Sequence, residues 1–167
     1  MIKKTKQLIL TALLLTVTNI PAFCQYGDAS YDSRVKSKLD DLGIKNEITS
    51  DGNFRIIFSM ENNRTQLVII NSATYQYGNI EVREIWSCAA IVNNKSAFTQ
   101  QNLFYILQEN SKLKIGAWQI DGTSDYGLNF SLRANANASS GNLDDLIRLA
   151  AKSADQMEQK LTDEDKH

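Results

Sequence analysis

The segment from residue 44 to residue 92 has the residue pattern of β-strands, and this pattern limits the fold more than any other feature. Apolar residues alternate with polar ones at residues 54–60, as in a strand with one buried face. Residues 67–70 are apolar at every position, which predicts a central strand covered on both faces. Turn residues, including Asp51-Gly52, separate the apolar segments. We therefore expect four consecutive strands, at residues 44–49, 54–60, 66–71 and 80–92.

Helical spacing of apolar residues marks three other segments. The first spans residues 31–42, with Asp28 as its expected N-cap and Gly43 as its stop. The second begins after Thr99, its expected N-cap, and the third runs over residues 143–161. Two more strands, at residues 115–120 and 126–132, are expected between the second and third helices, and a loop is expected at residues 134–141. This order predicts an α+β fold, with an antiparallel sheet of five or six strands and helices packed on one face.

The N-terminus has the layout of a cleavable secretory signal. Three lysines lie within the first six residues, an apolar run follows at residues 8–17, and Ala22 and Cys24 occupy the −3 and −1 positions before Gln25. The run is shorter than the roughly 20 residues that a membrane-spanning helix needs. We therefore expect residues 1–24 to be a signal peptide that is removed, and the mature protein to be periplasmic or secreted.

The rest of the chain has the composition of one globular domain, with 43% hydrophobic and 22% charged residues over the whole sequence. We expect a single α+β domain at residues 25–161 and a frayed, charged tail at residues 162–167. Three of the 18 basic residues lie in the signal, which contains no acid, so the mature chain has an acidic excess. This charge balance argues against nucleic-acid binding and against a polybasic membrane-binding patch.

Cys24 and Cys88 are the two cysteines of the chain. Cleavage after Cys24 would leave Cys88 alone, so no internal disulfide is expected. Cys24 could instead carry a lipid anchor, but Phe23 and Pro21 fit poorly at the positions before a lipidated cysteine. Cys88 shares a strand face with Trp86 and Ala90, which favours a buried, inert thiol over a redox group or a bridge between chains.

No residue pattern predicts catalysis, a metal site or a cofactor. The single histidine, His167, is the last residue of the chain, so it is poorly placed for acid–base or nucleophilic chemistry. The loop that begins at Asp121 alternates oxygen-bearing side chains but lacks the Gly and Glu of a calcium-binding loop. Asp144 and Asp145 are expected in the first turn of a helix, where the helix dipole favours acidic residues.

Four residues are candidates for binding a partner. Tyr75 and Tyr77 fall in an expected turn region without obvious burial, which favours surface recognition. The strand at residues 80–92 is apolar on much of both faces, and Ile85 and Ile91 lie on its second face. A sheet with helices on one side leaves such a face to be covered by a partner or by a second copy.

Three short segments carry a resemblance to a known family. They are Leu42-Gly43 at the end of the first helix, Asn110 to Trp118 before the next strand, and Ala154 to Glu158 with Leu161 on the last helix. In these segments and in the order of its elements over residues 29–161, the chain resembles the YbjN-like proteins, whose fold is similar to that of type III secretion chaperones. The resemblance implies helices on one face of a sheet, frequent homodimers, and regulatory or chaperone-like binding. It supplies no catalytic residues.

We therefore expect an exported, non-enzymatic protein- or peptide-binding module with a chaperone-like or regulatory role and a homodimer as one possible state. The alternative hypothesis is an enzyme, a small periplasmic hydrolase that uses two carboxylates. A third hypothesis is a structural envelope protein without a specific ligand. A deep cleft with two buried carboxylates would favour the hydrolase. An exposed apolar surface would favour the binding module.

Overall fold

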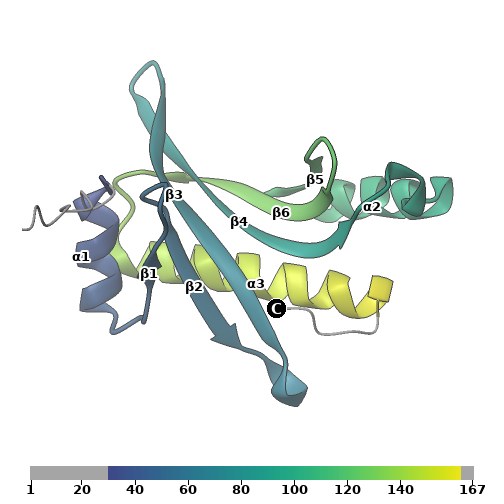
Figure 1. Cartoon of the computed structure of the whole chain (residues 1–167). Coiled ribbons are helices and arrows are strands. Elements are labelled where there is room, and N and C mark those ends of the chain that lie inside the picture. Colours follow the sequence, from purple (N-terminus) through teal and green to yellow (C-terminus); the bar gives the residue numbers. More distant parts are fainter. Residues whose placement is uncertain (1–29, 163–167) are drawn as a thin grey trace, which may run out of the picture.

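The computed structural model describes residues 30–162, which form one six-stranded antiparallel sheet and three α-helices (Figure 1). The strands lie in the order β1-β2-β3-β4-β6-β5. Their bounds are β1 Glu47–Ile48, β2 Phe54–Ser59, β3 Thr65–Tyr77, β4 Ile80–Val92, β5 Ala117–Asp121 and β6 Tyr126–Asn135. The helices are α1 Ser33–Asp41, α2 Gln100–Lys112 and α3 Ser140–Thr162, with short 3-10 turns at Glu61–Asn63 and Lys95–Ala97. The expected α+β fold class is confirmed.

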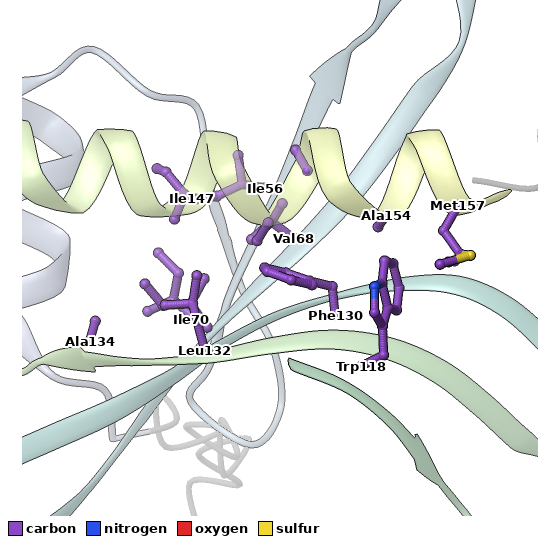
Figure 2. Packing of buried hydrophobic residues seen from close by; sticks show 14 of the residues in the cluster. Ile56, Val68, Ile70, Trp118, Phe130, Leu132, Ala134, Ile147, Ala154 and Met157 are labelled. Atoms are coloured by element: carbon purple, nitrogen blue, oxygen red, sulfur yellow. The ribbon is translucent and has the colours of Figure 1, made fainter. Parts of the chain in front are cut away.

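The core lies between α3 and one face of the central strands. Ile70, Ile85 and Leu132 are paired directly across β3, β4 and β6, and all three are buried. Figure 2 shows Ile147, Ala154 and Met157 of α3 lying over this face. Full burial of one such large aliphatic side chain contributes about 1.5–3 kcal/mol, so this row of contacts fixes the helix on the sheet.

Strands β3 and β6 extend further than the sequence pattern indicates, whereas β1 is shorter than the strand expected at residues 44–49. Strand β3 continues to Tyr77, so Tyr75 and Tyr77 lie in a strand rather than in a turn region. The turn itself is the two residues Gly78-Asn79, and Gly78 has a φ of 59°, which favours glycine. Strand β6 likewise continues to Asn135 and α3 begins at Ser140, so the expected loop at residues 134–141 is shorter.

Two bulges interrupt the regular pairing of the sheet. One lies in β3 between Ile70 and Thr74, and the other lies in β4 between Cys88 and Ala90. Glu84 is a charged residue on an otherwise apolar face of the strand at residues 80–92, which indicates a bulge or a sheet edge. The β3 bulge does lie opposite Glu84, between the pairs Ile70–Ile85 and Thr74–Arg83, whereas on its other side Glu84 pairs regularly with Arg133. The second bulge shifts the alternation of β4, which therefore does not keep one face from end to end.

The ends of the chain lie outside the described residues. The expected signal peptide at residues 1–24 lies outside them, and so do residues 163–167 of the expected tail. The proposed cap Asp28 is also outside, and the residue that caps α1 is Asp32. No helix within residues 30–162 is long and apolar enough to cross a membrane.

Candidate binding surface

The β3–β4 hairpin is a two-stranded ribbon with two different faces. Tyr75 lies opposite Val82, and Tyr77 lies opposite Ile80. Directly opposed residues share a face, as do residues two apart on one strand. We call the resulting apolar face the ribbon strip; it consists of Tyr75, Tyr77, Ile80 and Val82. Figure 1 shows the hairpin projecting from the end of the molecule that carries α1, with α2 at the opposite end.

The ribbon strip is open to solvent along most of its length. The exposed fractions of Tyr75, Tyr77 and Ile80 are 52%, 67% and 57%, and Val82 is partly buried. Isolated exposed apolar residues are normal on protein surfaces, but a row of adjacent ones marks a candidate interaction site.

The opposite face of the ribbon is polar and is held by α1. The two terminal nitrogens of Arg34 each donate to one carboxylate oxygen of Glu81 at 2.8 Å, and Arg34 also donates to Asn137 at 2.9 Å. Hydrogen bonding from Arg34 lowers the pKa of Glu81 to about 2. A two-point pair of this kind fixes orientation as well as distance, so the tip of the ribbon has a defined position.

A second pair holds the base of the ribbon. Arg83, only 1% exposed, donates to Asp32 at 2.5 Å and to the backbone oxygen of Asn71 at 2.9 Å. Asp32 also caps α1 by accepting from the backbone of Arg34. Burial opposes ionisation of Asp32, but hydrogen bonds from Arg34 and Arg83 outweigh it and hold the pKa of Asp32 well below its usual range.

These anchoring residues could not be found from the sequence. Arg34 and Glu81 are separated by 47 residues, and Asp32 and Arg83 by 51. The only local sign is that each segment carries two charged residues two positions apart. Which charge meets which depends on the packing of α1 against the hairpin.

The face of the sheet next to the ribbon strip has a polar centre. Glu84 accepts hydrogen bonds from Ser131 and Arg133, both at 2.5 Å. Trp86 donates its ring N–H to Asn71 at 3.2 Å. Because Glu84 is neutralised by Arg133, this centre interrupts the apolar surface without adding a net charge.

A second apolar surface lies on α2. We call it the α2 face; it consists of Leu103, Phe104 and Leu107, whose exposed fractions are 38%, 62% and 65%. Residues three and four apart on a helix are neighbours, so these side chains are contiguous. Ile106 is the one residue of this helix that is buried.

The structure places three of the four predicted binding residues on the surface. Tyr75, Tyr77 and Ile91 are exposed. Ile85 is fully buried in the core, so including it in an exposed surface was wrong. The bulge between Cys88 and Ala90 is the physical reason, because it places Ile85 and Ile91 on opposite faces although their numbers have the same parity.

A cavity of about 470 Å³ lies between the end of β2 and α3, lined by residues that include Phe58, Arg148 and Asp155. Beside it Arg64 pairs with two acids, Asp155 and Glu158, at 2.8 Å each. One guanidinium bridging two carboxylates accounts for both acids as an ion cluster that ties the segment before β3 to α3. Within residues 30–162, no group of three or more His, Cys, Asp or Glu side chains is arranged to hold a metal ion.

The Cys88 thiol is buried, as the sequence predicts. Its sulfur lies 3.4 Å from the backbone oxygen of Ala90. Burial raises the pKa of Cys88 to about 11. Little of this thiol is therefore thiolate, the reactive form, near neutral pH.

Comparison of the sequence with family models and with curated proteins finds no match. The resemblance to YbjN-like proteins therefore stays a prediction from the sequence.

Proposed function

We propose that this chain is an exported, non-enzymatic module that binds unfolded protein or peptide in a chaperone-like or regulatory role. The observation that supports this proposal best is the ribbon strip, an apolar surface that is exposed on one side and anchored by ion pairs on the other. An anchored surface loses little conformational freedom when it binds, so more of the contact energy is left for affinity. The signal-like N-terminus and the chaperone-like resemblance favour the same function.

We test this function with a protein kept unfolded by reduction and alkylation of its cysteines. The mature chain, residues 25–167, is titrated against the fluorescently labelled unfolded protein and against the same protein in its native form. Binding of the unfolded form alone is expected, with a loss of about tenfold in the Tyr75→Ser/Tyr77→Ser variant, because two large aromatic contacts are removed. Equal binding by this variant, or no binding by the wild type, would contradict the proposal.

We also propose that two copies associate through the α2 face. Residues 100–108 of this helix carry no charge, so two copies meet without repulsion at their centre. Two antiparallel helices would bring Leu103, Phe104 and Leu107 against the same residues of the second copy, as in a two-fold interface.

Light scattering during size-exclusion chromatography tests this association. The wild type is expected to elute as a dimer, and Phe104→Ser/Leu107→Ser as a monomer with unchanged helix content. Tyr75→Ser/Tyr77→Ser is the matched control and is expected to remain a dimer. A wild type that stays monomeric at high concentration would exclude the α2 face as a contact between copies.

A further inference from the structure

We propose that the ribbon strip receives an extended segment of an unfolded polypeptide, which pairs with the free edge of β3 and carries apolar side chains at alternate positions. This inference rests on the proposed function and names the form in which the ligand binds. Three features of the hairpin support it: an unpaired edge, the spacing of the strip and its size.

The first feature is the edge of β3. Strand β2 pairs with β3 from Thr65 to Ile70, and within residues 30–162 no other strand pairs with Thr74 to Tyr77 on the side away from β4. Tyr77 and Ile80 close a two-residue hairpin, so the backbone groups of Tyr77 and Tyr75 point toward β4. Those of Thr74 and Gln76 therefore point outward. Such an edge can accept another strand by main-chain hydrogen bonds.

The second feature is the spacing of the apolar residues. Tyr75 and Tyr77 are two residues apart on one strand, which is about 6.6–6.8 Å. A strand added beside them has the same repeat, so every second side chain of the ligand would lie next to one of the two rings. A helical ligand has apolar residues every three or four positions and cannot form the main-chain bonds.

The third feature is size. The exposed parts of Tyr75, Tyr77 and Ile80 amount to roughly 300–400 Å² of side-chain surface, given that a large side chain buries about 150–250 Å². A folded partner or a second copy of the chain needs about 800 Å² on each side for a stable complex. The strip lies on a projecting hairpin (Figure 1), so by itself it is too small for a folded partner and suits a short segment. The α2 face exposes a similar area, so a dimer through that face would also have to bury further residues along α2.

Charge sets the composition of the segment. The strip itself carries no charged residue. On its own side the nearest acid in β4, Glu84, is paired with Arg133, and on the reverse side Glu81 is paired with Arg34. Because the surface around the strip has no unpaired acid among the described residues, the ligand that fits it is an uncharged segment with alternating apolar and polar residues.

Two labelled peptides of identical composition test the inference, one with alternating apolar and polar residues and one with its apolar residues at helical spacing. Binding to the mature chain is measured by fluorescence anisotropy. The wild type is expected to bind the alternating peptide about tenfold more tightly. Equal affinity for the two peptides would overturn the inference, while strip-dependent binding of an unfolded protein would leave the proposed function in place.

A backbone variant tests the strand addition itself. Gln76→Pro removes the outward N–H of β3 and leaves the ribbon strip unchanged, since proline is tolerated on an edge strand. Gln76→Thr retains the N–H and is the matched control. We expect Gln76→Pro to weaken binding of the alternating peptide about tenfold and Gln76→Thr to leave it within about twofold, because one hydrogen bond is lost and its acceptor is left unpaired.

Two other outcomes would overturn the inference. Unchanged binding by Gln76→Pro, with circular dichroism like that of the wild type, would mean that the edge is not used. Conversion of a dimer to a monomer by Gln76→Pro would mean that a second copy occupies the edge. If Gln76→Pro proves unfolded, the comparison of the two peptides on the wild type still decides between an extended and a helical ligand.

Discussion

Arg83 shows how a single residue fixes the position of the candidate surface. A guanidinium with 1% exposure is stable only when its charge and its donors are satisfied, and Asp32 and the backbone of Asn71 supply the partners. Asp32 performs a second task as the N-cap of α1. The start of α1 and the base of the β3–β4 hairpin therefore depend on the same carboxylate, that of Asp32.

Replacing Asp32 by alanine is expected to lower the free energy of unfolding by about 3–5 kcal/mol. The reason is that Arg83 would remain buried without its counter-charge. Urea denaturation followed by circular dichroism measures the change. The control is Asp40→Ala, which removes an exposed ion pair with Lys36 on the same helix and should cost less than about 0.5 kcal/mol. Similar costs for the two variants would contradict the role assigned to Asp32.

At the scale of elements, α2 protects one edge of the sheet. The backbone N–H of Trp118 donates to the side-chain oxygen of Asn110 at 2.6 Å, and the side-chain nitrogen of Asn110 donates to the backbone oxygen of Trp118 at 3.1 Å. The amide of Asn110 thus occupies the position that a neighbouring strand would take beside β5. Covering an edge in this way prevents unwanted strand pairing.

We expect Asn110→Ala to destabilise α2 and β5 together, by about 1–3 kcal/mol, because both backbone groups of Trp118 lose their partner. Hydrogen exchange read by mass spectrometry should show faster exchange in residues 100–121 and unchanged exchange in α3. Gln108→Ala, on an exposed position of the same helix, is the control. Uniform acceleration over the whole chain would instead indicate global destabilisation.

The sequence predicts the helices and strands better than it predicts the bulges and the register that determine how they pair. Thr99 caps α2 as expected, because a cap is a local interaction between residues three apart. The bulge at Cys88 was missed, since small residues such as Ala89 and Ala90 fit either face and leave no local sign. The same holds for the candidate surface: the exposure of Tyr75 and Tyr77 is predicted from the sequence, but that Ile80 and Val82 lie beside them depends on the register of the hairpin.

For the whole molecule, the anchoring ion pairs predict a loss of stability in acid. The pKa of Glu81 is lowered to about 2 from an ordinary value of 4.5, and that of Asp32 is also lowered. The unfolded state therefore binds more protons as the pH falls below the ordinary values. The contribution of Glu81 is lost between about pH 4.5 and pH 2, and that of Asp32 over a range that extends to more acidic pH.

Glu81→Gln should accordingly lose less stability than the wild type between about pH 5 and pH 3, because its side chain takes up no proton in that range. Urea midpoints at the two pH values measure the difference. Asp125→Asn is the control, since Asp125 forms no ion pair within the described part of the chain. A pH dependence of Glu81→Gln equal to that of the wild type would show that Glu81 is not held in its ionised form.

The two apolar surfaces lie at opposite ends of the molecule, with the hairpin near α1 and α2 far from it (Figure 1). A dimer joined through the α2 face would therefore hold its two ribbon strips apart at its outer ends. One long unfolded chain could engage both strips, and the second contact would then be intramolecular and favoured by a high effective concentration.

This arrangement predicts that Phe104→Ser/Leu107→Ser weakens binding of a long unfolded protein by at least about tenfold but leaves binding of a short peptide unchanged. The short peptide reaches only one strip, so its affinity measures the strip alone. Anisotropy titrations with both probes, at a protein concentration where the wild type is dimeric, separate the two effects. Equal loss for both probes would mean that the α2 face itself contacts the ligand, and no loss for either would mean that the two strips act independently.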